Sequence, residues 1–237
     1  MDPGSEVSNF YDTFTQYELK SGVNLRHYTI FNAVIQSGLR RNHTVLEIGC
    51  GIGQLTGLLH RYLRKGKLVS TDISPESIAI ARKRVPPSTR MEFVVSDALM
   101  FEHRDKFDFI VLPDVLEHIP EEKHKDLFGK LRTFMHADSK IIIHIPHPKI
   151  IEYERIHHPE NLQIIDQPLP AANLLQSCYA HNLILVIYES YPLFHLENDY
   201  VLIVLKVDGM VQYAKKSRLK IIMRKSIARL KWMFRTI

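Results

Sequence analysis

Histidines that follow apolar runs are the side chains in this sequence best suited to proton transfer. His118 comes shortly after one such run, and His144 and His147 lie at the end of the next. An imidazole titrates near neutral pH, so each of them is a candidate to accept a proton from a hydroxyl or amine substrate. Tyr11, near the N-terminus, is a fourth candidate. The alternative for each histidine is a hydrogen-bonded loop residue without a chemical role.

A glycine-rich turn follows the first strongly apolar segment. Residues 45–56 read V-L-E-I-G-C-G-I-G-Q-L-T, with Gly49, Gly51 and Gly53 at alternate positions and Glu47 two residues before the first of them. Glycine permits unusual φ values and close approach of a ligand, so the pattern predicts a buried strand, a tight turn and a helix. Pyrophosphate-binding turns read G-x-G-x-x-G, and a carboxylate beside the turn would repel a phosphate. We therefore expect a nucleotide-like ligand that carries a positive charge.

Two further acids stand at the ends of apolar runs. Asp72 lies 23 residues after Gly49, and Asp97 follows the next run. An acid at the place of Asp72 can accept hydrogen bonds from both hydroxyls of a ribose. The alternative is a purely local role at the start of the next helix, where Ser74 is placed to cap and Pro75 to occupy the first turn.

Alternating strands and helices must position these residues. After the glycine turn, regular alternation of apolar runs with helical patterns predicts a mostly parallel α/β sheet. In such a sheet, ligands and reacting groups gather outside the carboxyl ends of the strands. The expected strands cover residues 68–72, 91–96, 107–112, 140–145, 183–191 and 199–206. One expected helix begins at residue 74, and two others cover residues 121–135 and 171–181.

The sequence resembles the class I S-adenosylmethionine (SAM)-dependent methyltransferases. Their first motif is similar to E/D-x-G-x-G-x-G, which Glu47 and the three glycines match, and their fourth strand precedes an L-E-H that residues 116–118 match. The likeness covers roughly residues 9–207 and extends to methyltransferases like those of ubiquinone biosynthesis. It implies SAM as cofactor, S-adenosylhomocysteine (SAH) as product, and a Rossmann-like, seven-stranded, mostly parallel sheet with helices on both faces and an antiparallel final strand.

The resemblance also implies roles for individual positions. An arginine near the place of Arg26 pairs with the SAM carboxylate in the ubiquinone-type enzymes, whereas a surface arginine is the alternative. Leu112 would line the cofactor from the fourth strand. The remaining cofactor contacts implied are Glu47, Gly49, Gly51 and Gly53 at the methionine end, Asp72 at the ribose with Ile73 beside it, and Asp97 and Ala98 at the adenine.

The first forty residues predict two helices, over 9–19 and 24–37, with Asn24 as N-cap and Gly38 as the stop. Aromatic residues are frequent there. They either cover one face of the sheet or form a lid over the cofactor, as in the resembled family, which would bring Tyr11 to the substrate. We therefore divide the chain into a helical lid (1–43), a SAM-binding core (44–209) and a basic tail (210–237).

The segment 148–170 follows the fifth strand, where this fold inserts elements that recognise the substrate. It contains Tyr153, Arg155, His157 and His158. Binding of the acceptor and a plain surface excursion remain alternatives for it. The histidines near the strand ends have no metal-binding spacing beyond a weak H-x-x-H at 144 and 147, so we expect no metal.

Charge is distributed unevenly along the 237 residues. The net charge is +5, but residues 211–237 contain nine Lys or Arg and no acid. Taking those nine from the total of 31 leaves 22 basic against 26 acidic residues in 1–210, a net of −4. The basicity therefore belongs to the tail. With two distant cysteines, no apolar run of 18 or more residues and no signal-like start, we expect a cytoplasmic protein.

The tail predicts a basic amphipathic helix. Three partners are open for it: an anionic membrane surface, its own protein or a second copy, and nucleic acid, which we disfavour because no RNA-binding module is visible. We expect methyl transfer from SAM to an oxygen or nitrogen of a small or lipid-linked acceptor, with a membrane surface as one candidate location. The alternatives are a soluble metabolite as acceptor, with the tail as an oligomerisation element, or an inactive SAM-binding regulatory or partner protein.

Overall fold

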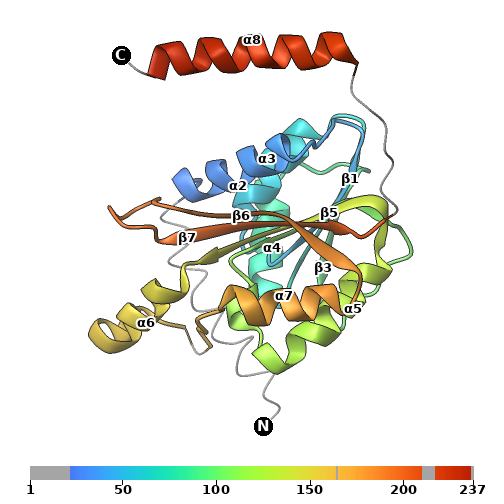
Figure 1. Ribbon diagram of the computed structural model, residues 1–237. Coiled ribbons are helices and arrows are strands. Elements are labelled where there is room, and N and C mark those ends of the chain that lie inside the picture. The colour runs from blue at the N-terminus through green and yellow to red at the C-terminus, as the bar shows by residue number, and fades with distance from the viewer. Residues whose placement is uncertain (1–21, 164, 210–216, 236–237) are drawn as a thin grey trace.

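The computed structural model describes residues 22–163, 165–209 and 217–235. Within them the strands form a seven-stranded sheet in the order β3-β2-β1-β4-β5-β7-β6 (Figure 1). Strands β1 to β5 pair in parallel, and β7 runs antiparallel to both β5 and β6. The strands are β1 (Thr44–Ile48), β2 (Lys67–Asp72), β3 (Met91–Val95), β4 (Phe107–Pro113), β5 (Met135–Pro146), β6 (Leu183–Tyr191) and β7 (Tyr200–Val207). The predicted mostly parallel α/β sheet with an antiparallel end is confirmed.

Helices cover both faces of this sheet (Figure 1). Helices α2 and α3 pack on one face, and α5 and α7 pack on the other. The helices are α2 (Leu25–Gln36), α3 (Gln54–Tyr62), α4 (Pro75–Arg84), α5 (His124–Thr133), α6 (Pro148–His157), α7 (Ala171–Tyr179) and α8 (Arg218–Arg235), with short 3₁₀ turns η1 (Leu116–His118), η2 (Glu121–Lys123) and η3 (Pro159–Asn161).

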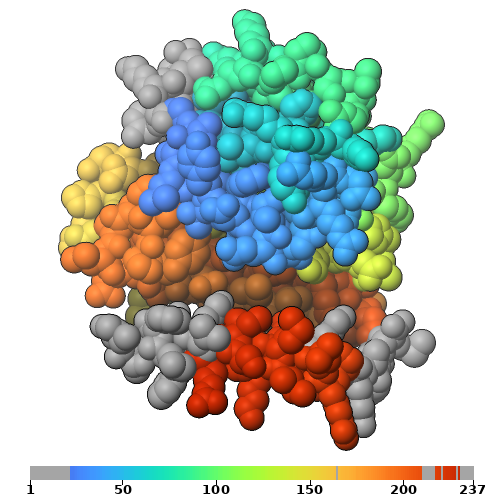
Figure 2. Space-filling model, turned by 90° about the horizontal axis from the view of Figure 1, so that it is seen from above, coloured from blue at the N-terminus to red at the C-terminus, as the bar shows by residue number. Residues whose placement is uncertain are grey.

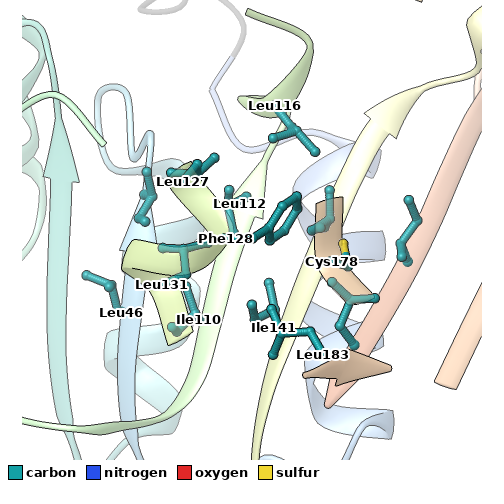
Figure 3. Packing of buried hydrophobic residues seen from close by; sticks show 14 of the residues in the cluster. Leu46, Ile110, Leu112, Leu116, Leu127, Phe128, Leu131, Ile141, Cys178 and Leu183 are labelled. Atoms are coloured by element: carbon teal, nitrogen blue, oxygen red, sulfur yellow. The ribbon is translucent and has the colours of Figure 1, made fainter. Parts of the chain in front are cut away.

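Alternation along the central strand β4 divides the core into its two faces. Phe109 and Val111 point toward α2 and α3, whereas Ile110 and Leu112 point toward α5 and α7. Figure 3 shows the second of these clusters, in which Phe128 of α5 lies among leucines and isoleucines of the sheet and of α5. Both faces of β4 are buried, which is why its sequence reads as a continuous apolar run.

Local signals fix the ends of α2, which comes before the glycine turn. The Asn24 side chain accepts a hydrogen bond from the His27 N–H, and the His27 side chain accepts one from the Asn24 N–H, so the helix begins with a capping box. Gly38, at φ +104°, follows its end. The predicted cap and stop are confirmed, while the helix expected over 9–19 lies outside the described residues.

Two elements differ from the sequence-based expectation. The helix expected over 121–135 is a 3₁₀ turn followed by α5, and the chain already enters β5 at Met135 instead of residue 140. The segment after β5 is helical: α6 begins with His147 as N-cap and Pro148 in its first turn.

Helix α8 is formed by the basic tail and lies at one edge of the molecule, where it is coloured red in Figure 2. Its described apolar side chains are solvent-exposed: Leu219, Ile221, Ile222, Met223 and Ile227 are each more than half exposed. No helix in the described ranges is long and apolar enough to span a membrane.

Candidate functional site

The glycine turn joins β1 to α3 with three residues at positive φ. Gly49, Gly51 and Gly53 have φ values of +75°, +50° and +84°, which glycine adopts without the steric cost of a Cβ. A Cβ on Gly49 would also lie 2.1 Å from Cγ2 of Val115, which follows β4. Gly53 instead meets Ala81 of α4, where a Cβ would lie 3.1 Å from the alanine Cβ. The first glycine therefore shapes the cavity side of the turn, and the last one lets α3 and α4 approach.

Glu47 lies fully buried beneath this turn. Its Oε2 accepts hydrogen bonds from the hydroxyls of Thr56 and Ser70, each at 2.6 Å, while its Oε1 is buried without a hydrogen-bond partner among the described residues. Burial raises the pKa of Glu47 to about 7, although the two hydroxyls oppose this rise. Two hydroxyls thus hold Oε2 of Glu47 in place, while Oε1 has no hydrogen-bond partner among the described residues.

Asp72, at the end of β2, fastens the turn. One carboxylate oxygen accepts the N–H of Gly51 at 2.7 Å, and the other accepts the N–H of Ser74 at 2.9 Å. At the end of the neighbouring strand, Asp97 accepts the N–H of Leu99 at 2.7 Å. Both acids therefore face the same edge of the sheet as the glycines.

A cavity of about 590 Å³ opens at this edge, over the carboxyl ends of β1 and β4. These two strands are neighbours at the place where the strand order reverses, which is where open α/β sheets bind ligands. One wall is made by the glycine turn and by the residues after β2 and β3. The opposite wall comes from later parts of the chain and includes Glu117, His118, Glu154, Gln163, Asp166, Phe194, His195 and Tyr200.

His118 stands on the second wall between two carboxyl groups. Its Nδ1 lies 2.7 Å from the Ile165 carbonyl oxygen and 3.1 Å from Oδ1 of Asp166, and its Nε2 lies 3.9 Å from Oε1 of Glu117. Burial lowers the pKa of His118, but Glu117 and Asp166 outweigh burial and raise it to about 9. Burial also raises the pKa of Glu117 to about 8, against the opposing effect of His118. Its Oε2 is a second buried carboxyl oxygen without a hydrogen-bond partner among the described residues.

A chain of polar contacts lies between the two walls. The Arg26 guanidinium is 3.0 Å from Oδ2 of Asp114, whose Oδ1 is 2.6 Å from Nδ1 of His144. Nε2 of His144 is 2.7 Å from the hydroxyl of Tyr191. Burial raises the pKa of Asp114, but Arg26 and His144 outweigh it and hold the pKa at about 2. The Arg26–Asp114 ion pair is therefore charged throughout the neutral range.

The cavity brings most of the residues predicted from sequence together, and others lie elsewhere. Gly53 and Leu112 are not on the cavity wall, and Leu112 is part of the apolar core. His144 is buried behind Asp114, whereas His147 caps α6. Tyr11 lies outside the described residues. The predicted residues that line the cavity are Arg26, Glu47, Gly49, Gly51, Asp72, Ile73, Asp97, Ala98 and His118.

Several residues of this region were not assigned a role from sequence. Asp114 and Glu117 belong to the same D-V-L-E-H stretch as His118, so their position after β4 was a usable signal. Asp166, Tyr191 and Tyr200 had no comparable signal, because their contacts depend on the fold. Among the described residues, no group of three or more His, Cys, Asp or Glu side chains is arranged to hold a metal ion.

Comparison with known proteins gives a consistent result. Residues 45–138 match a family described as a methyltransferase domain. Nodulation protein S of Sinorhizobium fredii is 30% identical over 111 residues, which are 47% of this chain and 47% of that protein. A malonyl-acyl-carrier-protein O-methyltransferase of Ilyobacter polytropus is 23% identical over 137 residues, which are 58% of this chain and 48% of that protein. The chain spans about half the length of these curated relatives.

Solved structures share the fold over a longer stretch. The magnesium protoporphyrin IX methyltransferase of Synechocystis with bound SAH superposes with a TM-score of 0.67 at 15% identity, covering 87% of this chain and all of that one. The N-methyltransferase NodS of Bradyrhizobium japonicum gives a TM-score of 0.61 at 18% identity, covering 78% of this chain and 95% of that one. At these identities the likeness concerns the fold. Residues 45–138 thus match a methyltransferase domain, and the chain shares the fold of solved SAM-dependent methyltransferases.

Proposed function

We propose that this chain transfers a methyl group from SAM to an oxygen or nitrogen of a small or lipid-linked acceptor. The observation that carries the proposal is a single cavity with two different walls. One wall has the glycine turn and the acids of a nucleoside site, and the other has a histidine held between two carboxyl groups. Cofactor and acceptor would meet between them.

The cofactor wall fits the charges of SAM. The amino-acid end of SAM carries an ammonium and a carboxylate beside a positive sulfonium. On this wall, Oε1 of Glu47 and Nε of Arg26 are buried polar atoms without a hydrogen-bond partner in the described part of the chain. An acceptor atom and a donor atom are thus both unsatisfied, as a zwitterionic group requires. Asp72 would bind the ribose and Asp97 the adenine.

Chemistry at the second wall follows from the state of His118. SAM supplies a methyl group on a good leaving group, so holding the acceptor in line provides most of the catalysis. Nδ1 of His118 faces the Ile165 carbonyl and Asp166, so it carries a proton, and Nε2 lies on the side of Glu117, where the two groups together would face the acceptor. With a pKa of about 9, His118 is mostly protonated at neutral pH and would accept a proton only as the pH approaches that value.

The names of the relatives leave the acceptor class open. They include a nodulation protein, malonyl-acyl-carrier-protein methyltransferases and trans-aconitate 2-methyltransferases. What this chain shows is a second wall with both carboxyl groups and aromatic side chains, among them Glu117, Phe194 and Tyr200. This composition suits a polar nucleophile attached to an apolar or aromatic body.

Calorimetric titration with SAH tests the cofactor part of the proposal. We expect the wild-type chain to bind SAH and Asp72→Ala to bind it about a hundredfold more weakly or worse. The variant loses hydrogen bonds from two ribose hydroxyls to a charged group, each contributing roughly 1.5–3 kcal/mol. Asp105→Ala is the matched control, because Asp105 forms an exposed ion pair with Lys67 away from the cavity. Absence of SAH binding by the wild-type chain would refute the proposal.

Turnover separates an enzyme from an inactive SAM-binding protein. We expect the wild-type chain to form SAH from SAM when it is given a suitable hydroxyl or amine acceptor. The double variant with Glu117→Ala and His118→Ala should not form SAH. Tight SAM binding without turnover on any acceptor would favour the regulatory alternative.

The proposal places the enzyme at an anionic membrane surface through α8. The apolar side chains from Leu219 to Ile227 are exposed, and Arg218, Arg224, Lys225 and Arg229 are exposed on the same helix without any acidic neighbour in 211–237. A helix of this kind lies in the membrane interface, and its basic residues favour anionic lipid.

Liposome flotation tests the membrane part by itself. The full chain should float with anionic vesicles and only weakly with neutral ones, and a chain ending at Gly209 should float with neither. Ile222→Asp with Ile227→Asp should abolish flotation while leaving SAH binding unchanged. If the full chain does not float and light scattering shows a dimer that the shortened chain lacks, α8 is an oligomerisation element.

A further inference from the structure

Arg26 occupies an unusual position between the two walls of the cavity. It lies in the first turn of α2, lines the cavity and is about one-third exposed through its side chain, at 29%. Nη1 of its guanidinium forms an ion pair with Asp114, but Nε is buried without a hydrogen-bond partner among the described residues. An anion in the cavity would satisfy that donor. The guanidinium must be held against Asp114 to present it.

Asp114 has a left-handed backbone conformation, with φ at +52°. Residues with a Cβ adopt this region uncommonly, and aspartate is among those that do so most readily. Two contacts to His144 hold Asp114 in this conformation: its N–H donates to the His144 carbonyl oxygen at 2.8 Å, and its carboxylate lies 2.6 Å from Nδ1 of the ring.

The His144 ring is fixed in turn. Its side chain is fully buried, and it stacks on Tyr200 with ring centres 4.7 Å apart and an angle of 21° between the planes. The ionised carboxylate of Asp114 can only accept, so Nδ1 of His144 carries a proton and donates it to Asp114. Burial raises the pKa of the Tyr191 phenol, so the hydroxyl stays protonated, and it is hydrogen-bonded to Nε2 of His144. Both ring nitrogens are therefore occupied, and the ring is not on the cavity wall.

We infer that Tyr191, His144 and Asp114 are positioning residues that hold the Arg26 guanidinium for the carboxylate of SAM. The inference rests on the proposed function, since it requires the cofactor in this cavity. It assigns His144 a role different from that of a proton-accepting catalytic residue. It also gives β6 a part in cofactor binding, although β6 is the strand at the far edge of the sheet from β3.

Two ligands that differ only in the amino-acid end provide the test. SAH contains the carboxylate, whereas 5′-methylthioadenosine has the same nucleoside and thioether without it. For Tyr191→Phe, which removes one hydroxyl, we expect SAH to bind roughly threefold to tenfold more weakly. Binding of 5′-methylthioadenosine should stay within about twofold of the wild-type value, since it makes no contact with Arg26. Tyr188→Phe is the matched control and should change neither, because Tyr188 lies on the same strand and is 38% exposed.

A double variant shows whether Tyr191 acts through Arg26. Arg26→Ala should lose SAH affinity by about tenfold to a hundredfold, and Arg26→Ala with Tyr191→Phe should bind SAH as weakly as Arg26→Ala alone. The inference is overturned if Tyr191→Phe leaves SAH binding unchanged, or weakens SAH and 5′-methylthioadenosine alike, as a general structural defect would. If the wild-type chain binds neither ligand, the proposed function fails first and this inference fails with it.

Discussion

Replacement of Gly49 by alanine tests the geometry of the cofactor turn directly. At φ +75° an added Cβ places the residue in the left-handed region, which costs roughly 1–2 kcal/mol. The same Cβ would lie 2.1 Å from Cγ2 of Val115, so Val115 or the turn must move. Overpacking of this kind costs typically about 1–3 kcal/mol. Together we expect Gly49→Ala to lower the free energy of unfolding by about 2–5 kcal/mol.

Gly57→Ala is the matched control within the next element. Gly57 lies inside α3, and a Cβ there has no heavy atom within 4 Å. Alanine is favoured over glycine in a helix interior by roughly 0.5–1 kcal/mol, so this variant should be slightly more stable than the wild type. The two substitutions add the same methyl group and are expected to change stability in opposite directions.

Urea denaturation of both variants, followed by circular dichroism, measures the difference. Adding Val115→Ala to Gly49→Ala removes the colliding methyl groups, so it should recover the overpacking part of the loss and leave the backbone part. SAH affinity should fall in Gly49→Ala, because the turn and Val115 both line the cavity. A Gly49→Ala protein as stable as the wild type would refute the geometry of the turn as described.

Two further predictions concern buried titratable groups. Burial raises the pKa of Glu47 from 4.5 to about 7, so the folded state binds this proton more readily than the unfolded state. The stability that comes from this proton is lost as the pH rises from 4.5 toward 7. Glu47→Gln should therefore reduce the fall in unfolding free energy between pH 5 and 7, and an unchanged fall in urea denaturation experiments would contradict the raised pKa. Asp166→Asn should lower the pKa of His118 from about 9, because it removes one of the two carboxylates that favour the charged ring. Proton NMR of the imidazole resonances measures that shift, with the exposed His157 as internal control and His118→Gln to identify the signal; a His118 midpoint that does not move would show that Asp166 is not its partner.

The sequence was sufficient for those parts of the site that depend on local pattern. Gly49, Gly51 and Asp72 follow apolar runs, and strands whose carboxyl ends share an edge bring such residues together without further information. The start of α6 also has a local signal, since His147 is its cap and Pro148 stands in its first turn.

The remaining contacts depend on strand pairing that no local pattern specifies. Tyr191 reaches His144 across 47 residues because β7 lies between β5 and β6, with Leu202 opposite His144 and Tyr200 opposite Tyr191. That register follows from the complete sheet. Asp166 lies in a segment without regular periodicity, so its approach to His118 had no signal in the sequence.

The strand order separates the residues that would bind the cofactor from those that would bind the acceptor. Under the proposed function, the SAM wall is built largely from residues 47–98, before β4, and the acceptor wall from residues 113–200, after the reversal in strand order. The two walls are thus separate stretches of one chain that meet along the line between β1 and β4. Substitutions in the later stretch, in α6 or in the loop between β6 and β7, can alter which molecule is methylated while the source of the methyl group stays the same. Asp114 and Tyr191 are the exception, because they belong to the later stretch but would hold Arg26 for the carboxylate of SAM, so changes there should weaken SAM binding.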